Sequence, residues 1–179
     1  MQRYSVFLTP GGADFAYTDN LIRELSGMYG APLFEPHVTV YSGTLTDVDA
    51  LKKAISTAVS GIRPFALRVR RVGCGESYFK SLFIEFEENL ILREIHDRIR
   101  AGMEIESGYE LIPHLSLLYS DMPLLHKEAL AKRVIVDRQE IHFDGMKIVI
   151  PLNREEGWRD TGQWQTLLRV GLEEACPGA

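Results

Sequence analysis

Two short segments of this 179-residue chain are near copies of each other. Residues 36–40 read PHVTV and residues 113–117 read PHLSL, with the two histidines, His37 and His114, 77 positions apart (114 − 37). Because aliphatic residues alternate with polar ones, each segment is expected to be a β-strand. The repeated pattern indicates that the chain folds into two similar units, each containing one such strand.

Each strand would carry an imidazole and a hydroxyl on one face, because side chains at positions i and i+2 point the same way. His37 would project with Thr39, and His114 with Ser116. Histidine suits both a general base and a general acid, since its ordinary pKa is about 6.5, and hydroxyls can stabilise developing negative charge. Two such strands facing each other would surround one phosphate with groups for in-line phosphodiester hydrolysis, with no metal needed.

The rest of the chain shows further strand and helix patterns. Besides the motif segments, strands are expected at 4–9, 65–72, 81–86, 141–152 and 165–170. A helix is expected at 19–29, ended by Gly30, and three more are expected to begin after Thr46, Asn89 and Asp121. Thr46 and Asn89 have the short polar side chains that cap helix N-termini.

Both motif strands follow a helix and a loop and precede another helix, so one αβα order occurs twice. Strands and helices mixed without strict βαβ alternation are typical of α+β folds with antiparallel sheets. We therefore expect a single domain over residues 1–179, with two antiparallel-sheet lobes related by an approximate two-fold axis around a central groove. No segment is long enough to act as a linker between independent domains.

The charge of the chain limits its partners. The chain has 25 acidic and 20 basic residues, a formal charge of −5 and a pI of about 5.6. Proteins that grip long nucleic acid are usually basic, so a small bound anion is the better expectation. The main basic stretch, Arg68, Arg70 and Arg71, is expected to be a solvated strand face.

Compartment and membrane signals are weak or missing in this sequence. No secretory signal is visible at the first residues, and no apolar run approaches the eighteen residues of a membrane span. Cys74 and Cys176 are expected to be free thiols in a reducing compartment. We therefore expect a cytoplasmic monomer without a membrane contact.

Two alternatives to a catalytic role are open for the paired histidines. They could be structural, or they could be metal ligands, but a metal would need a third ligand, and no HExxH motif or carboxylate cluster occurs. One H-x-[ST] would carry little weight, whereas two copies framed by the same proline and aliphatic residues favour a joint catalytic role. His96, His126 and His142 lack the motif and are expected at the surface. Trp164 could line the rim of the groove, although a packed structural role is favoured.

The two segments resemble the paired H-x-[ST]-x motifs of the two-histidine (2H) phosphoesterase superfamily, in its cyclic phosphodiesterase branch. The similarity extends to YSVFLTP near the start, FEPHVTVYSG, ALKKAIS, the G-x-S-Y-F stretch at 75–79 and PHLSLLYSD, and it is looser after residue 140. The resemblance implies a bilobal α+β fold with the motif strands lining a groove. It also implies hydrolysis of 2′,3′-cyclic nucleotides or ADP-ribose 1″,2″-cyclic phosphate to monoesters, without metal or other cofactor.

The resemblance also suggests roles for particular residues. His114 would be the general base and His37 the general acid, while Thr39 and Ser116 would hold the phosphate oxygens. Tyr119 would lie near the groove only if its strand ends or bulges there, since residues 114, 116 and 118 share a face. Tyr78 and Phe79 lie where the family places an aromatic side chain that can stack on a base, although a core role is equally compatible with the sequence.

Two further functions compete with a small-molecule cyclic phosphodiesterase. One is an RNA-end 2′,3′-cyclic phosphodiesterase or 2′–5′ RNA ligase, for which more basic surface around the groove would be expected. The other is a nucleotide-binding module without catalysis, which would not need a histidine in both motifs. Turnover of cyclic nucleotides by variants of the two motif histidines separates the enzymes from the binding module.

Overall fold

Seven strands form one antiparallel sheet in the computed structural model, which describes residues 2–103, 107–152 and 158–173. The strands are β1 (Arg3–Pro10), β2 (Val38–Thr44), β3 (Phe65–Cys74), β4 (Leu82–Phe86), β5 (His114–Leu118), β6 (Glu140–Pro151) and β7 (Trp164–Gly171). Their order is β1-β2-β5-β4-β3-β6-β7, and a further pairing of β1 with β6 closes the first six into a circuit. The prediction of an α+β fold with antiparallel pairing is confirmed.

The two motif strands are neighbours in this circuit. β2 and β5 pair through one residue couple, Val38 with Leu115, and both residues are fully buried. This narrow contact and the pairing of β3 with β6 join one group of strands, β2, β1, β6 and β7, to another, β5, β4 and β3. The two antiparallel-sheet lobes that the sequence suggested are therefore joined in one continuous sheet, and the motifs lie at the β2–β5 junction.

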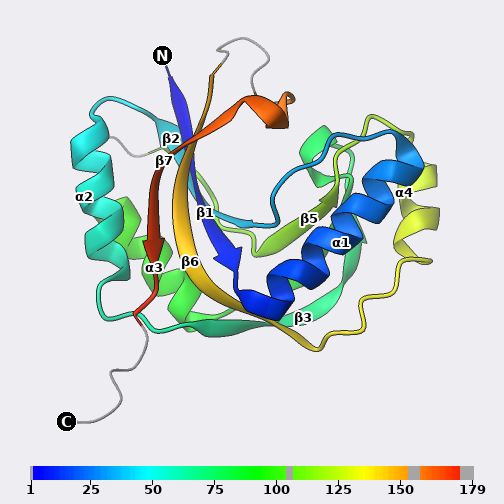
Figure 1. Cartoon of the computed structure of the whole chain (residues 1–179), viewed down its shortest axis with the longest axis horizontal. Coiled ribbons are helices and arrows are strands. Elements are labelled where there is room, and N and C mark those ends of the chain that lie inside the picture. Colours follow the sequence, from blue (N-terminus) through cyan, green and yellow to red (C-terminus); the bar gives the residue numbers. More distant parts are fainter. Residues whose placement is uncertain (1, 104–106, 153–157, 174–179) are drawn as a thin grey trace.

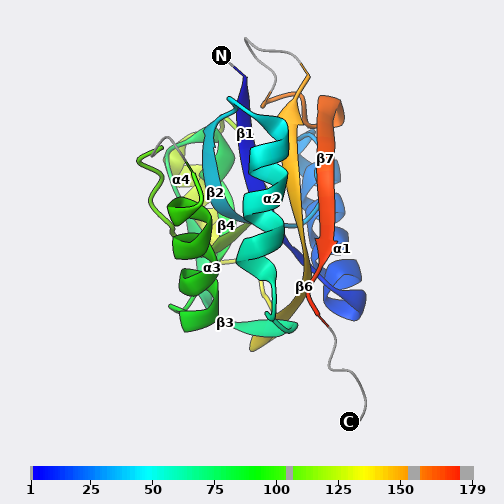
Figure 2. The ribbon, with the colours of Figure 1, turned by 90° about the vertical axis from the view of Figure 1, so that its left-hand side faces the viewer.

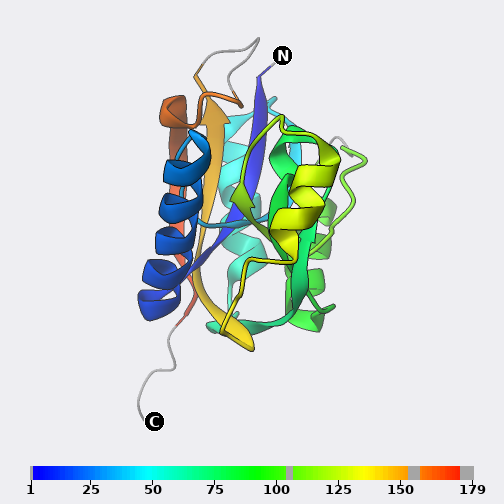
Figure 3. The same ribbon diagram turned by 90° about the vertical axis from the view of Figure 1, so that its right-hand side faces the viewer.

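Four helices cover the two sides of the sheet in the described part of the chain: α1 (Gly12–Tyr29), α2 (Val48–Val59), α3 (Leu90–Ala101) and α4 (Leu124–Ala131). Helices α2 and α3 lie side by side on one side (Figures 1 and 2), and α1 and α4 lie on the other (Figure 3). Short 3-10 turns, η1 (Tyr78–Lys80) and η2 (Thr161–Gln163), precede β4 and β7. None of the helices in the described residues is long and apolar enough to span a membrane.

The helix boundaries show where local sequence signals are sufficient. Gly30 ends α1 in the left-handed conformation, at φ 60°, as expected. Asn89 caps α3, and its side-chain oxygen accepts from the amides of Ile91 and Leu92 at 2.9 and 3.1 Å. Along α3, Leu92, Ile95 and Ile99 recur at helical spacing and are fully buried, which fixes the face that packs on the sheet.

Two helix starts differ from the prediction. α2 is capped by Asp47 rather than Thr46, because the Asp47 carboxylate accepts from the amides of residues 49 and 50 at 2.8 and 3.0 Å. α1 begins at Gly12 rather than at residue 19, because Asp14 in its first turn is held by a tertiary contact that no local pattern shows. Its carboxylate accepts from the backbone and ring nitrogens of His142, both at 2.9 Å.

Replacing Asn89 with alanine is expected to lower the free energy of unfolding by about 1 kcal/mol, because two amides at the start of α3 lose their acceptor. Urea denaturation measures this as a lower midpoint at an unchanged slope. Asn89→Asp keeps the acceptor and serves as the control, with a midpoint closer to that of the wild type. An alanine variant with the wild-type midpoint would contradict the capping role of Asn89.

Candidate active site

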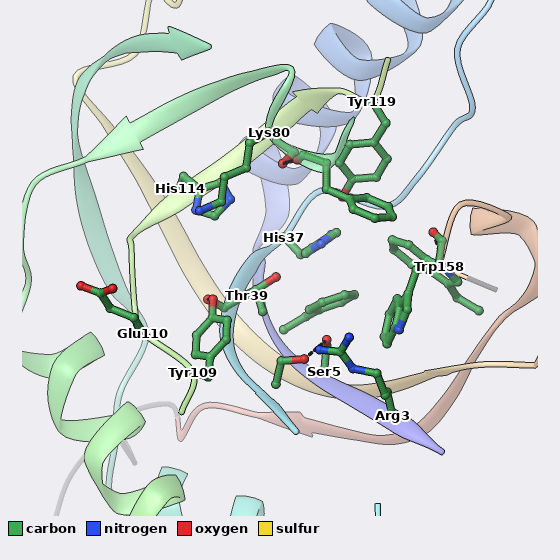
Figure 4. A pocket seen from close by; sticks show the side chains of 15 residues that line it. Arg3, Ser5, His37, Thr39, Lys80, Tyr109, Glu110, His114, Tyr119 and Trp158 are labelled. Carbon is green, nitrogen blue, oxygen red and sulfur yellow. Dashed lines mark hydrogen bonds between the residues drawn. The ribbon is translucent and has the colours of Figure 1, made fainter. Parts of the chain in front are cut away.

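The register of β2 and β5 brings the four motif side chains together. Antiparallel partners run in opposite directions, so the Val38–Leu115 couple puts Thr39 across from His114 and His37 across from Ser116. All four side chains line one cavity of about 270 Å³ (Figure 4). The two histidines thus lie on a diagonal, each next to the hydroxyl of its own strand and across from the hydroxyl of the other.

The same hydrogen bond orients both imidazoles. His37 Nδ1 lies 2.6 Å from the carbonyl oxygen of Glu35, and His114 Nδ1 lies 2.7 Å from that of Ile112. A carbonyl only accepts, so Nδ1 carries the proton in both rings and Nε2 keeps a lone pair in the neutral form. In both motifs the accepting residue precedes a proline, which confines it to an extended conformation.

His37 is buried in an aromatic setting. Its ring stacks on Phe7 with centroids 3.7 Å apart and meets Trp164 edge-on at 5.9 Å, and its exposed fraction is 5%. Burial lowers the pKa of His37 to about 3, helped by the positive charge of Lys147, against the opposing effect of the Glu35 carbonyl. His37 is therefore uncharged at neutral pH in the empty site.

His114 has the same local geometry but a more open environment. Its ring meets Phe83 edge-on at 5.5 Å, and the side chain is only partly buried. Burial again lowers the pKa, the carbonyl of Ile112 opposes this, and the Lys80 ammonium adds to the lowering. Both imidazoles are thus neutral at pH 7, and each can accept a proton through Nε2.

A charged cluster lies directly behind His37. The carboxylate of Glu35 accepts hydrogen bonds from Lys147 on β6 and from Arg169 on β7, the latter through two contacts of 3.2 Å. Burial raises the pKa of Glu35, but the hydrogen bonds from Arg169 and Lys147 bring it below its ordinary value. Lys147 is 4% exposed and lies over the Phe7 ring at 5.7 Å, so the cluster supports the surface on which His37 stacks.

The hydroxyl groups differ in their partners. Ser116 Oγ donates to the carbonyl oxygen of Phe79 at 2.9 Å, which ties β5 to η1. Thr39 points into the cavity (Figure 4), and its backbone carbonyl accepts from the Tyr109 hydroxyl at 3.0 Å. The Ser116 hydroxyl would have to leave Phe79 in order to donate to a bound phosphate, whereas the position of Thr39 already suits that role.

Tyr119 enters the cavity because its strand ends one residue earlier. β5 stops at Leu118, so Tyr119 leaves the alternation and lines the cavity, with its ring stacked on Phe34 at 3.8 Å. Its side chain is 3% exposed, and burial raises the pKa of its phenol. The strand therefore ends before Tyr119, as the sequence analysis required for a place near the groove. Contact of Tyr119 with a substrate stays a prediction.

The aromatic residues of the cavity were only partly anticipated. Phe79 lines it, but Tyr78 lies beside it, 5.9 Å from Tyr119, and is not among the lining residues. Of the two roles considered for Trp164, the less favoured one is observed, because Trp164 lines the cavity together with Trp158. The remaining lining residues, which carry no motif, are Arg3, Ser5, Phe7, Ser42, Lys80, Tyr109 and Glu110.

The three histidines without the motif lie outside the cavity. His126 and His142 are exposed, as expected. His96 was expected at the surface but is 7% exposed, because its ring packs 5.9 Å from Tyr41 and 6.4 Å from Tyr109. In the described part of the chain, no three His, Cys, Asp or Glu side chains form a group that could hold a metal ion.

The basic stretch on β3 lies at the surface, and Cys74 forms no disulfide. Arg70 and Arg71 are exposed and pair with Glu85 at 2.9 and 2.6 Å, so this strand face is solvated as predicted. Cys74 is a free thiol, partly buried. Cys176 lies outside the described residues, so its expected state is untested.

Comparison with known proteins gives matches over most of the chain. Residues 1–169 match the model of a family described as cyclic phosphodiesterase-like protein. A cyclic phosphodiesterase of Arabidopsis thaliana is 27% identical over 119 residues, covering 66% of this chain and 66% of that protein. A 2′,3′-cyclic-nucleotide 3′-phosphodiesterase of Kluyveromyces lactis is 29% identical over 159 residues, covering 78% of this chain and 74% of that protein.

A solved structure agrees in fold. Escherichia coli LigT, determined with 3′-AMP, superposes with a TM-score of 0.61 at 13% identity, over 97% of this chain and 99% of the other. The identity is low, so this similarity concerns the fold, and it extends over nearly the whole chain. The chain spans just under two thirds of the length of the Arabidopsis relative.

The low pKa of His37 predicts that acid destabilises the protein. Between the ordinary pKa of about 6.5 and the folded value of about 3, the unfolded chain binds one more proton than the folded chain. The free energy of unfolding should therefore fall by up to about 1.4 kcal/mol per pH unit below pH 6.5. Urea denaturation in phosphate-free buffer at pH 6.5 and pH 5 should show a smaller loss in His37→Phe than in the wild type. Equal losses would contradict the assignment of a neutral buried His37.

Proposed function

The chain belongs to the cyclic phosphodiesterase-like family of the 2H phosphoesterase superfamily, and from this premise we propose that it hydrolyses small cyclic phosphates to phosphomonoesters. The proposed substrates are 2′,3′-cyclic nucleotides, in line with the activity for which the yeast relatives are named. ADP-ribose 1″,2″-cyclic phosphate is the second candidate in this class. The observation that supports the proposal best is the pairing of Val38 with Leu115, which brings both motif histidines to one cavity.

The reaction needs one proton acceptor and one proton donor. A water oxygen attacks phosphorus while the base takes a proton from that water through Nε2. The bond from phosphorus to one ribose oxygen breaks, and the acid gives its proton to that oxygen, which leaves a monoester on the other. We assign the base to His114 and the acid to His37, as the family resemblance implies, and each group is expected to contribute about 10²- to 10⁴-fold in rate.

The acid must acquire its proton when the substrate binds. His37 has a pKa of about 3, so its Nε2 carries no proton at pH 7. A phosphate charge about 4 Å away is worth on the order of 4 kcal/mol at an effective dielectric constant of 20. A negative charge beside the ring favours the protonated imidazole, so substrate binding should raise the pKa of His37 toward neutrality. An anionic substrate thus helps to charge the acid that it needs.

Further cavity residues have supporting roles in the proposal. Thr39 and Ser116 donate hydrogen bonds to the phosphoryl oxygens, whose charge develops in the transition state. Tyr119 lies beside Ser116 and is placed to contact the phosphate or the attacking water. Lys80 and Arg3 add positive charge at the cavity wall, which favours an anionic ligand of nucleotide size. No step of this mechanism uses a metal.

Loss of either motif histidine is expected to lower kcat for 2′,3′-cyclic AMP by at least 10²-fold. His37→Ala and His114→Ala are compared with the wild type, with the product identified by phosphorus NMR and with binding of adenosine 2′-phosphate measured alongside. His126→Ala, which removes an exposed histidine from α4, is the matched control. Wild-type turnover in both motif variants would refute the mechanism. A metal chelator should leave the rate of the wild-type enzyme unchanged.

Binding of a phosphate monoester should take up protons. At pH 7 the empty site holds neutral histidines, and the bound anion raises the pKa of His37 toward neutrality, so a fraction of the protein binds a proton with the ligand. Calorimetry of adenosine 2′-phosphate binding in buffers of different ionisation enthalpy measures the number of protons taken up per bound ligand. Uptake should be larger in the wild type than in His37→Ala, after correction for the proton of the phosphate itself. An equal uptake in both proteins would place the proton elsewhere.

A further inference from the structure

Both tryptophans of the chain lie on one short segment, residues 158–164, here named the tryptophan strap. Trp158 and Trp164 both line the cavity that holds the motif histidines. Their rings are 5.5 Å apart at 69°, and the Trp164 indole N–H donates to the Trp158 carbonyl oxygen at 3.2 Å. The two rings thus form one aromatic wall whose geometry is set within the strap.

The strap is attached to distant parts of the fold. Arg159 donates to both carboxylate oxygens of Asp121, just after β5, at 2.6 and 3.2 Å, and lies over the Tyr78 ring of η1 at 4.1 Å. Thr161 donates to the carbonyl of Leu33 at 2.5 Å. A segment that leads into β7 is therefore fastened to the loop before β2, to η1 and to the loop after β5.

The aromatic wall lies beside the reacting groups. Trp164 meets His37 at 5.9 Å, and Trp158 lies across the cavity from His114 and Glu110 (Figure 4). When a cyclic phosphate is held between the histidines, the nucleoside part of the substrate must lie either against the wall around Glu110 or against the strap. The wall around Glu110 carries its carboxylate beside the ring of Tyr109. Phe79, where the family resemblance places a stacking ring, also lines the cavity, but the strap offers two large flat rings next to each other.

We propose that the tryptophan strap is a nucleobase subsite, in which the Trp158 ring stacks on the base of a nucleoside cyclic phosphate. Stacking on aromatic side chains is strong and tolerant of base identity, because every base has a π-face. Arg159 is a positioning residue that holds the strap over the cavity. Its ion pair with Asp121 is exposed, and exposed pairs are weak and screened by salt, so this part of the attachment should weaken as the salt concentration rises. This inference rests on the proposed function.

A matched pair of substrates tests the subsite. The probes are 2′,3′-cyclic AMP and methyl riboside 2,3-cyclic phosphate, in which a methoxy group replaces the base. Trp158→Ala should lower kcat/KM for cyclic AMP about 5- to 150-fold more than for the riboside, the range that base stacking provides. Trp158→Phe should restore most of the selectivity. Tyr29→Ala, which removes an exposed aromatic ring outside the cavity, is the control and should leave the selectivity unchanged. Equal losses on both substrates, or no loss on either, would overturn the proposal.

Intrinsic fluorescence gives a readout that does not depend on turnover. Since the chain has two tryptophans, both in the strap, adenosine 2′-phosphate should quench the emission, whereas ribose 5-phosphate should not. Trp158→Phe should lose a large share of the quenching. Quenching without hydrolysis would support the nucleobase subsite and refute the proposed function. Hydrolysis of cyclic AMP with the same selectivity in all variants would support the proposed function and refute the subsite.

The attachment by Arg159 has its own control. Arg138 repeats the arrangement away from the cavity, 5.0 Å from the Tyr17 ring and 3.9 Å from Asp14. At low salt, Arg159→Ala should raise KM for cyclic AMP several-fold with little change in kcat, and Arg138→Ala should not. At high salt the wild type should approach the Arg159→Ala value. An unchanged KM in Arg159→Ala at low salt would contradict the proposed positioning role of Arg159.

Discussion

The candidate site depends on a hydrogen bond from each motif imidazole to a carbonyl two residues earlier. The contact is made twice, at 2.6 Å for His37 and 2.7 Å for His114. It fixes the tautomer, because a carbonyl accepts and cannot donate, and it turns Nε2 toward the cavity. The proline of each motif makes the contact possible by keeping the preceding residue extended. Without this bond, the strand register would bring two rings together with no defined orientation or proton.

The two histidines share this geometry but not their surroundings. His37 is enclosed by aromatic rings and has a cluster of two cations and one carboxylate behind it, whereas His114 is more open. The cluster has a net charge of about +1, which repels a proton from His37 and attracts an anion to the cavity in front of it. Glu35 has two roles: its backbone carbonyl orients His37, and its carboxylate compensates the buried Lys147. Both raise the pKa of His37 and so oppose the effect of Lys147. Burial of a lysine is tolerated because this partner is present.

The sequence predicted what is local and missed what depends on distant contacts. Alternation and helical periodicity placed most strands and helices, and the paired motifs identified His37 and His114. The tertiary contact of Asp14, which starts α1 early, left no local signal, and neither did the burial of His96. Trp158 carries no motif, and its place in the cavity follows from the path between β6 and β7, which a single sequence does not show. The role of the motif prolines became clear only with the carbonyl contacts.

The near symmetry of the motifs has a consequence for the chemistry. The local two-fold relation between β2 and β5 would give a bound phosphate an imidazole and a hydroxyl on each side, so the four motif residues by themselves could not distinguish the two ends of a cyclic diester. Which ester oxygen faces the acid must be set by parts of the cavity that break the symmetry. Those parts are the Glu35 cluster behind His37, the tryptophan strap on one wall, and Tyr109 and Glu110 on the other. In the proposed mechanism, the unmatched residues therefore set the direction of cleavage, and the matched ones supply the rate.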